Sequence, residues 1–388
     1  MSTTYLIKLG ELTLKGGNRE EFELRLKHNL RSMLHKTGSE VLTTRGRFFL
    51  RCPETSEARA EDALSRIIGI SGWAKARIAP KTVEAVLSAC VKEAALLVGQ
   101  GKKTFKIEAR RSDKGFPLDS YGIMREAGGA VLEAHPELSV DVHNPDGIIE
   151  VEIREQAYIY GLTQSGIRGL PVGTAGRGLL LLSGGIDSPV AGFLMGKRGM
   201  RIDAVHFHSY PYTSAEAQEK VVKLATLLSR YLQSVRLTTV GFTQVQVRIK
   251  ERAPDSWATI LLRMAMMELS GRLARANKSK CLITGESLSQ VASQTIENLS
   301  CTESRARMPV LRPLIAIDKI DTVDIAKKIG SYETSILPYP DCCALFSTEH
   351  PVLKADLMEA TALYDSLALT DILEDALRDR TEQRIGGF

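Results

Sequence analysis

The stretch Gly178-Leu-Leu-Leu-Leu-Ser-Gly-Gly-Ile-Asp-Ser-Pro-Val190 decides the fold of this chain. Leu179 to Leu182 form an apolar run of the kind that a buried parallel strand needs. The small residues Ser183-Gly-Gly185 follow, and they let a phosphate approach backbone N–H groups. Ser188 and Pro189 then suit the N-cap and the first position of a helix. The stretch therefore predicts a strand, a phosphate-binding turn and a helix whose N-terminus faces the glycines.

Spacing separates this turn from two better-known phosphate loops. A Walker A loop needs a Lys followed by Ser or Thr after its last glycine, and the dinucleotide fingerprint needs G-x-G-x-x-G. Neither pattern is present here. The segment Ser183-Gly-Gly-Ile-Asp-Ser188 instead resembles the pyrophosphate loop (PP-loop) of ATP-pyrophosphatases, which use ATP to adenylate an oxygen and release pyrophosphate. A Gly-Gly turn after a strand is common by itself, so Asp187 and Ser188 carry most of this interpretation.

The composition indicates a folded protein of two or three domains. The chain has 388 residues, of which 44% are hydrophobic and 25% are charged. No apolar run approaches the roughly 20 residues that span a bilayer, and no secretory signal opens the chain, so we expect a cytoplasmic protein. The six cysteines form no C-x-x-C pair and have no regular spacing, so we expect neither a zinc site nor a disulfide framework. With a net charge of +5, a nucleic-acid partner would need a local basic patch.

The N-terminal half predicts two small α/β domains. Over residues 1–79, strands and helices alternate in the order βαββαβ of a ferredoxin-like fold. Residues 80–165 restart the alternation with a helix, a strand, a second helix and a hairpin over Ile148 to Leu162. The glycines of residues 166–178 break any period, and we expect a linker or mobile loop there.

Residues 179–388 predict an α/β domain with a doubly wound parallel sheet. Apolar strands expected at 179–182, 202–207, 235–240 and 281–284 alternate with helices. In such a sheet the ligand binds in a crevice at the carboxyl ends of the strands. The tail from Val352 is predicted to be helical.

Several residues beside the predicted strand ends should meet in that crevice. His206 and Phe207 end the second strand, and Gly285 follows the fourth. Arg263 and Gln294 lie on the helices expected before and after that fourth strand. An aromatic edge suits adenine, and the two polar side chains could reach phosphate or ribose. Taken singly, a core histidine and a solvated arginine are the ordinary alternatives.

Two adjacent cysteines, Cys342 and Cys343, follow prolines that disfavour regular structure. A thiol on such a loop can be exposed, and its thiolate is a good nucleophile where a cation lowers its pKa. Two ordinary cysteines at a helix edge are the alternative. Cys52, Cys90 and Cys281 fall inside predicted strands and a helix, so we assign them to the core.

A local basic cluster lies in the second domain, with Phe105 and Phe116 nearby. Such a cluster can neutralise phosphates while an aromatic ring stacks on a base, as recognition of irregular RNA requires. A solvated charged face is the usual alternative. The candidate RNA-binding residues are Lys102, Lys103, Lys106, Arg110, Arg111 and Lys114.

Together these residues resemble the tRNA 4-thiouridine synthetase family, also called tRNA sulfurtransferases, over essentially the whole chain. The resemblance implies a ferredoxin-like domain (1–79), a THUMP RNA-binding domain (80–165), a linker (166–178) and a PP-loop ATP-pyrophosphatase domain (179–388). The motifs that carry it are Leu182-Ser-Gly-Gly-Ile-Asp-Ser-Pro-Val-Ala191, Thr284-Gly-Glu-Ser-Leu-Ser-Gln-Val-Ala-Ser-Gln-Thr295, Arg312-Pro-Leu with Asp318-Lys319, and Cys343 after Pro-Asp-Cys.

The resemblance implies the activity of a tRNA uracil 4-sulfurtransferase. ATP would activate O4 of uridine 8 in tRNA with release of pyrophosphate, and a cysteine persulfide would then deliver sulfur to give 4-thiouridine. Sulfur transfer to a small carrier protein of thiazole synthesis in the thiamine pathway is also implied. The implied cofactors are ATP and Mg²⁺. The implied partners are tRNA, a cysteine desulfurase as sulfur donor, the sulfur-carrier protein and a second copy of the chain.

The resemblance also assigns roles to residues. Asp187 would organise Mg²⁺ and the departing pyrophosphate, Cys343 would carry the persulfide, and Lys319 is a candidate for stabilising charge at the adenylated oxygen. The implied ATP-binding residues are Leu181, Leu182, Ser183, Gly184, Gly185, Ser188, His206, Phe207, Arg263, Gly285 and Gln294.

The sulfur route stays open at this point. The sequence ends at Phe388, so we expect a form without the C-terminal rhodanese domain that many relatives carry. A desulfurase could load Cys343 directly and another thiol could resolve it, but a disulfide with the adjacent Cys342 would close a strained ring. The alternative functions are an ATP-pyrophosphatase with another acceptor, such as a 2-thiouridine-forming enzyme or an amide-forming synthetase, and an RNA-binding protein with a regulatory nucleotide site.

Overall fold

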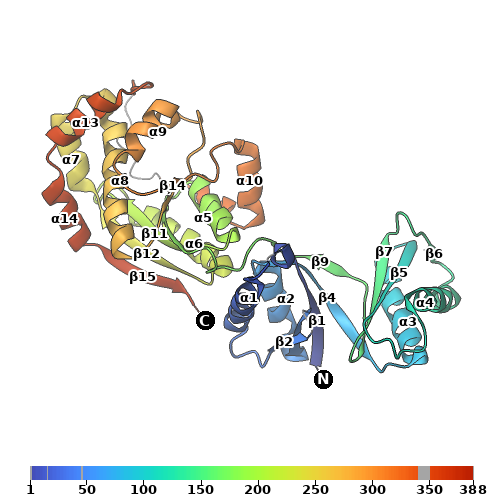
Figure 1. Cartoon of the computed structure of the whole chain (residues 1–388). Helices are drawn as coiled ribbons and strands as arrows, with labels where there is room; N and C mark the ends of the chain where they lie inside the picture. Colours follow the sequence, from blue (N-terminus) through green and yellow to red (C-terminus); the bar gives the residue numbers. More distant parts are fainter. Residues whose placement is uncertain (1, 15, 45–46, 340–349, 388) are drawn as a thin grey trace. The chain divides into compact units, whose positions relative to one another are not determined.

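Two units make up the chain, Met1–Gly169 (unit 1) and Leu170–Phe388 (unit 2) (Figure 1). The computed structural model describes residues 2–14, 16–44, 47–339 and 350–387. Across these ranges no helix combines the length and the apolarity that crossing a membrane requires.

The first part of unit 1 is a four-stranded antiparallel sheet with two helices. Its strands lie in the order β2-β3-β1-β4, which is the ferredoxin-like arrangement. The buried side chains Leu26 and Leu30 of α1 and Leu64 of α2 face this sheet's core. The elements are β1 (Ser2–Leu9), α1 (Arg19–Met33), β2 (Glu40–Thr44), β3 (Arg47–Pro53), α2 (Glu57–Arg66) and β4 (Ile70–Ala79).

The second part of unit 1 continues the same sheet through β4. Residues 70–76 of β4 pair with β1, and residues 77–79 pair with β8, so that the order extends as β4-β8-β7-β5-β6. Helices α3 and α4 pack together and against β5 and β7 around Phe105 and Val151. The elements are α3 (Val83–Gly99), β5 (Thr104–Arg111), α4 (Ser120–Ala134), β6 (Ser139–Val140), β7 (Gly147–Ile153), β8 (Ala157–Tyr160) and β9 (Thr163–Ser165).

Unit 2 contains a sheet in the order β14-β13-β10-β11-β12-β15. The first five strands are parallel, and β15 is antiparallel to β12. The elements are β10 (Arg177–Leu181), α5 (Asp187–Lys197), β11 (Arg201–His208), α6 (Ala215–Leu232), β12 (Ser234–Gly241), α7 (Thr243–Arg252), α8 (Ala258–Ala276), β13 (Leu282–Ile283), α9 (Ile296–Glu303), β14 (Val310–Leu311), α10 (Lys319–Lys328), α11 (Tyr332–Ser335), α13 (Leu357–Ser366), α14 (Thr370–Arg378) and β15 (Thr381–Gly386).

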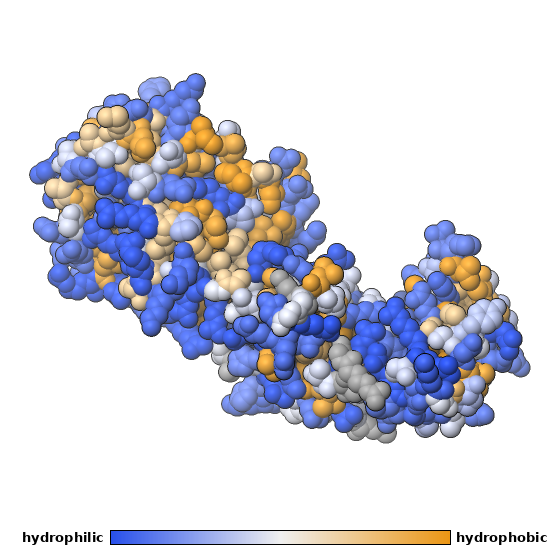
Figure 2. All heavy atoms as spheres, in the orientation of Figure 1, coloured by the Kyte–Doolittle hydropathy of each residue, from blue (hydrophilic) through white to orange (hydrophobic). Residues whose placement is uncertain are grey.

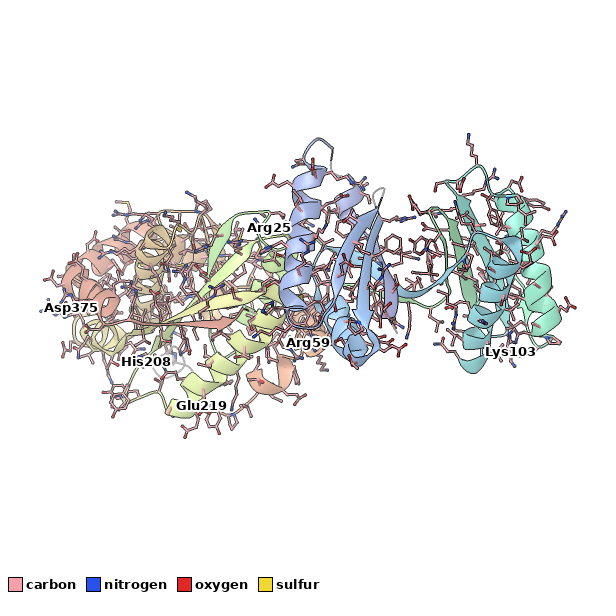
Figure 3. All side chains as sticks on the ribbon, turned by 90° about the horizontal axis from the view of Figure 1, so that it is seen from below. Arg25, Arg59, Lys103, His208, Glu219 and Asp375 are labelled. Atoms are coloured by element: carbon pink, nitrogen blue, oxygen red, sulfur yellow. The ribbon has the colours of Figure 1, made fainter. Side chains whose placement is uncertain are left out.

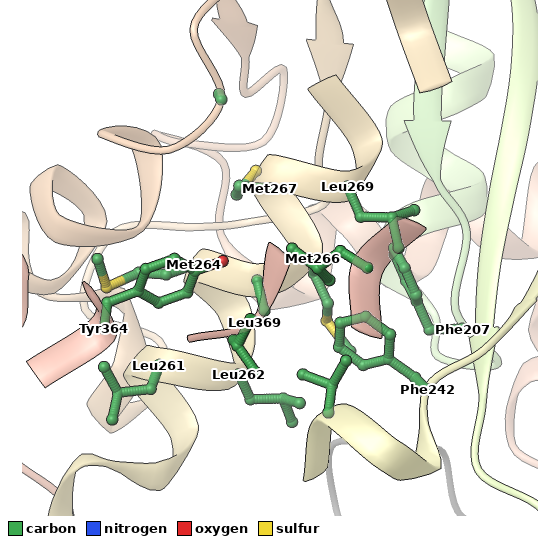
Figure 4. Packing of buried hydrophobic residues seen from close by; sticks show 14 of the residues in the cluster. Phe207, Phe242, Leu261, Leu262, Met264, Met266, Met267, Leu269, Tyr364 and Leu369 are labelled. Atoms are coloured by element: carbon green, nitrogen blue, oxygen red, sulfur yellow. The ribbon is translucent and has the colours of Figure 1, made fainter. Parts of the chain in front are cut away.

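Helices cover both faces of this sheet, as a doubly wound fold requires. Figure 1 shows α5, α6 and α10 on one side and α7, α8, α13 and α14 on the other. The core between α8 and the sheet joins Met266 to Phe207 and Phe242, and Tyr364 of α13 packs on the outer side of α8 (Figure 4). Together with the ferredoxin-like part of unit 1, this sheet confirms the predicted fold class.

Two predictions within unit 2 were wrong in detail. The helix after the glycines begins at Asp187, so Ser188 lies inside its first turn and is not the N-cap. The acid-rich tail forms the predicted helices, but it ends in β15, whose residues 381–386 pair with β12.

The glycine-rich segment after β9, expected to be a linker or mobile loop, makes backbone hydrogen bonds to each of the two units. In unit 1, the Arg168 N–H donates to the carbonyl of Ile70 at 2.8 Å. In unit 2, the Leu170 N–H donates to the carbonyl of Lys197 at 2.9 Å. Regular pairing resumes at Arg177, where β10 begins.

Candidate nucleotide-binding site

A cavity of about 340 Å³ opens at the carboxyl ends of β10, β11 and β13. This is the switch point of the sheet, because the chain adds β11 and β12 on one side of β10 and then returns to place β13 on the other. The volume falls in the range of small-molecule sites. The cavity is lined by Leu181, Leu182, Ser183, Gly185, Asp187, Ser188, Val205, His206, Phe207, Arg263, Met266, Met267, Thr284, Gly285, Glu286 and Gln294.

The loop between β10 and α5 forms one wall and is held by two serines. The Ser183 N–H donates to Ser188 Oγ at 3.0 Å, and the two hydroxyl oxygens also lie 3.0 Å apart. Ser188 lies in the first turn of α5 and is buried, so its hydrogen bond to Ser183 ties the loop to the helix. The first N–H groups of a helix and its dipole favour an anion at this end. The loop thus lies at the N-terminus of an 11-residue helix and has the features of a phosphate-binding loop.

Close packing behind the loop depends on glycines. A Cβ atom on Gly285 would lie 2.7 Å from Ser188 N and 2.8 Å from the Asp187 carbonyl carbon, and both are backbone atoms that cannot give way. A Cβ on Gly192 would lie 2.7 Å from Leu180 Cδ2. The turn after β13 and helix α5 can therefore approach each other and β10 only without side chains at these positions.

The opposite wall is apolar and comes from β10, β11 and α8. Phe207, Met266 and Met267 are all buried and line the cavity. His206 is also buried, and its Nδ1 lies 3.2 Å from the carbonyl oxygen of Leu182. Since a carbonyl only accepts, Nδ1 carries the proton of this hydrogen bond. This wall has the chemistry that a planar base such as adenine requires.

A buried carboxylate joins two arginines at the end of β13. Glu286 is 2% exposed. Its two oxygens accept from Arg263 and, at 2.7 Å, from Arg312 Nε. Burial alone would raise the pKa of Glu286, but the two guanidinium groups outweigh burial and hold it below its usual value. Glu286 is therefore ionised and fixes Arg263 at the cavity wall.

Two buried polar atoms at the cavity fit a nucleotide. Among the described residues, Arg263 Nε and Gln294 Oε1 are buried without a hydrogen-bond partner. Buried polar groups are normally paired, so these two atoms on cavity-lining residues are candidates to pair with a polar ligand, although unpaired buried atoms such as Trp73 Nε1 also occur away from the cavity. A guanidinium donor suits a phosphate or ribose oxygen, and an amide oxygen suits a ribose hydroxyl or an exocyclic amine.

Asp187 lies at the cavity mouth and contacts two side chains from other segments. Its Oδ1 is 2.5 Å from the Lys319 ammonium, and its Oδ2 accepts from Gln290 Nε2 at 3.1 Å. Lys319 is the first residue of α10, where the helix dipole disfavours a cation. The ion pair with Asp187 offsets this unfavourable position of the Lys319 ammonium at the start of α10.

The structure brings most of the predicted nucleotide-site residues together. Every predicted ATP-binding residue lines the cavity except Gly184, which lies between the lining residues Ser183 and Gly185. Gln294 stands in a short 3-10 turn, Ala292–Gln294, and not on the predicted helix. Lys319 reaches the site through Asp187. Cys342 and Cys343 lie outside the described residues.

The predicted RNA-binding residues divide into two groups. Lys102 and Lys103 precede β5, with Lys103 labelled in Figure 3, whereas Arg110 and Lys114 lie at or beyond its other end. An eight-residue strand is roughly 25 Å long, so these groups cannot form one compact patch. The Arg111 guanidinium donates to the carbonyls of Phe116 and Leu118 at 2.9 and 3.1 Å. Arg111 therefore holds the loop that follows β5. Lys106 forms an ion pair with Glu108.

Some residues of the site were missed in the sequence. Glu286 directly follows Gly285, and the rule that residues after a strand meet at the crevice could have found it. Met266 and Met267 read as ordinary residues of a buried helix, and Gln290 carries no local signal. Their places depend on how α8 and the turn after β13 pack.

Comparisons with known proteins agree with this architecture. Residues 173–369 match a family described as thiamine biosynthesis protein (ThiI), residues 4–74 match its ferredoxin-like domain, and residues 80–161 match a THUMP domain. A probable tRNA sulfurtransferase of Treponema pallidum (strain Nichols) is 51% identical over 100% of this chain and 97% of its own length. Another, from Caldanaerobacter subterraneus subsp. tengcongensis, is 45% identical over 97% of this chain and 99% of its own length.

Solved structures give the same result. A 4-thiouridine synthetase crystallised with RNA and bound ATP is 36% identical, with a TM-score of 0.92 over 99% of this chain and 100% of that one. A protein from Pyrococcus horikoshii Ot3 is 27% identical, with a TM-score of 0.65 over 84% of this chain and 99% of that one. With a family model that covers most of unit 2 and relatives that span the whole length, the chain belongs to the tRNA sulfurtransferase (ThiI) family.

Proposed function

We propose that this chain is a tRNA uracil 4-sulfurtransferase, which uses ATP to activate O4 of uridine 8 in tRNA and then exchanges that oxygen for sulfur. One observation carries the proposal: the loop before α5, the apolar wall and Asp187, which pairs with Lys319, line a single cavity. The family relatives are named tRNA sulfurtransferases, and the similar crystal structure is described as a 4-thiouridine synthetase with RNA and ATP.

In the activation step the chain's residues bind ATP and orient it. The apolar wall would hold the adenine, and Arg263 and Gln294 would use their unpaired buried atoms on ribose or phosphate. The first turn of α5 would hold the phosphates. Bound ATP supplies an electrophilic α-phosphorus, which O4 of uridine attacks as pyrophosphate leaves. The Lys319 ammonium, already at the cavity mouth, would offset the negative charge that develops there.

Asp187 fits a role in holding Mg²⁺. The described residues contain no group of three or more metal-ligating side chains. Mg²⁺ at a nucleotide site is usually held by one or two carboxylates together with phosphate oxygens and water, so one aspartate at the phosphate loop meets the need. Mg²⁺ would neutralise phosphate charge during the reaction.

Sulfur delivery is assigned to Cys343. A cysteine desulfurase would load its thiol as a persulfide, and the terminal sulfur would attack C4 of the activated uridine while AMP leaves, so that Cys343 is joined to the base through an S–S bond. A second thiol would then attack the Cys343 sulfur, which releases 4-thiouridine and leaves a disulfide on Cys343, and an external thiol reductant would return that disulfide to the free thiol. Support for this step comes from the resemblance of the Pro-Asp-Cys-Cys343 segment to the family motif. The buried Cys90 and Cys281 are poor alternatives, because burial raises the pKa of both thiols and disfavours the nucleophilic thiolate.

Unit 1 is proposed to bind tRNA. It matches a THUMP domain, and its visible face is largely hydrophilic (Figure 2), as contact with a phosphate backbone requires. Arg110 and Lys114 form one candidate contact group, and Lys102 and Lys103 form another. A second copy of the chain is a proposed partner, so that one tRNA can contact an RNA-binding unit and an active crevice.

A second activity is proposed for the same sulfur. The matched family is described as a thiamine biosynthesis protein, which favours transfer of sulfur from Cys343 to a small carrier protein of thiazole synthesis. This activity would use the same Cys343 persulfide as thiolation of tRNA.

Two variants separate activation from sulfur delivery. Asp187→Asn should lower pyrophosphate release with tRNA by roughly 100-fold, because it removes the carboxylate proposed to organise the departing pyrophosphate. Cys343→Ser should leave a single turnover of pyrophosphate release intact and abolish thiolation that depends on a desulfurase and cysteine. Pyrophosphate release can be followed by chromatography and thiolation by mass spectrometry of nucleosides.

The opposite pattern would reject the assignments. Full thiolation by Cys343→Ser with desulfurase would remove Cys343 from the sulfur route. Unchanged thiolation by Asp187→Asn would remove Asp187 from activation. A product of 2-thiouridine would favour the related ATP-pyrophosphatases that modify the other uracil oxygen.

A further inference from the structure

Lys220 of α6 is buried beside the phosphate-binding loop. Its exposed fraction is 5%. A lysine side chain is seldom so deeply buried, because removing its ammonium from water is costly unless the ammonium is paired. Lys220 does not belong to the ATP-binding set that the sequence predicts, and it does not line the cavity.

The Lys220 side chain ends against Gly184, the second residue of the loop. A Cβ atom placed on Gly184 would lie 3.4 Å from Cδ and Cε of Lys220 and 3.6 Å from its Nζ. Ser183 and Gly185, on either side of Gly184, both line the cavity. One loop residue therefore separates the ammonium from the space where phosphates would lie.

Other contacts fix the ammonium in this place. Nζ donates to the carbonyl oxygen of Leu337 at 2.8 Å, and α11, which precedes Leu337, packs on α6. Helix α6 also packs on α5, the helix that follows the loop. The charge is thus held in position before any ligand arrives, which is the arrangement that electrostatic stabilisation favours.

We propose that Lys220 is a positioning residue of the phosphate subsite, whose fixed positive charge behind Gly184 strengthens binding of the ATP triphosphate. This inference rests on the proposed ATP site and adds a residue to it. A charge within about 8 Å of a phosphate in the partly buried interior of a protein should change affinity roughly 10-fold or more. Adenosine, which has no phosphate, should not respond to it.

The test compares two ligands on the full-length protein without tRNA. The probes are the ATP analogue with a methylene group between its α- and β-phosphates, and adenosine, both measured by calorimetry. Lys220→Gln removes the charge and keeps a donor for Leu337, and Lys220→Arg keeps the charge. The matched control is Lys223→Gln, because Lys223 lies one turn along α6 with 61% of its side chain exposed and pairs with Glu219.

We expect Lys220→Gln to weaken binding of the ATP analogue roughly 10-fold or more and to leave binding of adenosine unchanged. Lys220→Arg and Lys223→Gln should bind the ATP analogue with an affinity within about 3-fold of the parent protein's. The first variant preserves the charge at position 220, and the second removes only a solvent-exposed charge. If Lys220→Gln does not fold, Lys220→Met provides the same comparison.

Equal weakening of both ligands would overturn the proposal, because Lys220 would then only support the local fold. Unchanged binding of the analogue would overturn it as well. These outcomes are distinct from failure of the proposed function, in which the analogue binds and responds to Lys220 but tRNA acquires no 4-thiouridine.

Discussion

Glu286 balances the charges of the cavity wall, since it is buried between Arg263 and Arg312. Replacing it by glutamine would leave two guanidinium groups near each other without their carboxylate. Breaking a buried ion pair in this way costs about 3 kcal/mol or more. We therefore expect Glu286→Gln to lower the free energy of unfolding by about 3 kcal/mol, measured by denaturant titration at neutral pH.

The control for this variant is Glu303→Gln. Glu303 accepts from the same Arg312 at 2.6 Å, but its side chain is 45% exposed, so its loss should cost about 1 kcal/mol or less. Equal denaturant midpoints of unfolding for the parent protein and Glu286→Gln would show that the Glu286 carboxylate does not hold the two arginines together.

At the scale of single residues, the sequence predicted cavity-lining residues where they lie at or just after a strand end. His206, Phe207 and Gly285 lie at the cavity because the rule about the carboxyl ends of parallel strands places them there. Ser188 lines the cavity as predicted, but its side chain makes a different hydrogen bond from the predicted N-cap. Its hydroxyl accepts from Ser183 within the loop, whereas an N-cap would have accepted from the helix. Propensity alone could not distinguish these two hydrogen bonds.

At the scale of elements, the turn after β13 and the start of α5 touch through Gly285. A methyl group there would meet the backbone of Asp187 and Ser188, so one element must shift. We expect Gly285→Ala to weaken binding of the ATP analogue roughly 10-fold, because a shift of the contacting backbone by a few tenths of an ångström would displace the loop before α5. Calorimetry on the full-length protein measures this change.

Gly241→Ala is the matched control. The nearest heavy atom to its added Cβ would be His208 Nε2 at 3.8 Å, an ordinary contact. Binding of the analogue should be unchanged in this variant. If Gly285→Ala bound the analogue as well as the parent does, the two elements would have more freedom than their packing indicates.

Elements with a strong apolar pattern were predictable, and those set by distant partners were not. Leu179 and Leu180 identify β10 because a central parallel strand is buried on both faces. By contrast, β15 has the sequence Thr-Glu-Gln-Arg-Ile-Gly, which is exposed along most of its length and lacks an apolar period. Only its pairing with β12 makes it a strand, so tertiary context decides where propensity is weak.

At the scale of the whole molecule, each unit has its own core and its own proposed task. The sheet of unit 1 runs through β4 from the ferredoxin-like part into the part that matches a THUMP domain, and unit 2 holds the nucleotide cavity. The sequence predicted three runs of alternating strands and helices, at residues 1–79, 80–165 and 179–388, with the glycines of residues 166–178 before the third. It could not show that β4 belongs to both parts of unit 1, because shared pairing of one strand leaves no local pattern.

The most direct test of the account is mass spectrometry of nucleosides from tRNA incubated with the full-length protein, Mg-ATP and inorganic sulfide. Sulfide replaces the sulfur donor, so the result depends only on binding and activation. The account predicts 4-thiouridine at position 8 that requires ATP and disappears with Asp187→Asn. A folded protein that binds tRNA and ATP but yields no thiolated nucleoside would contradict it.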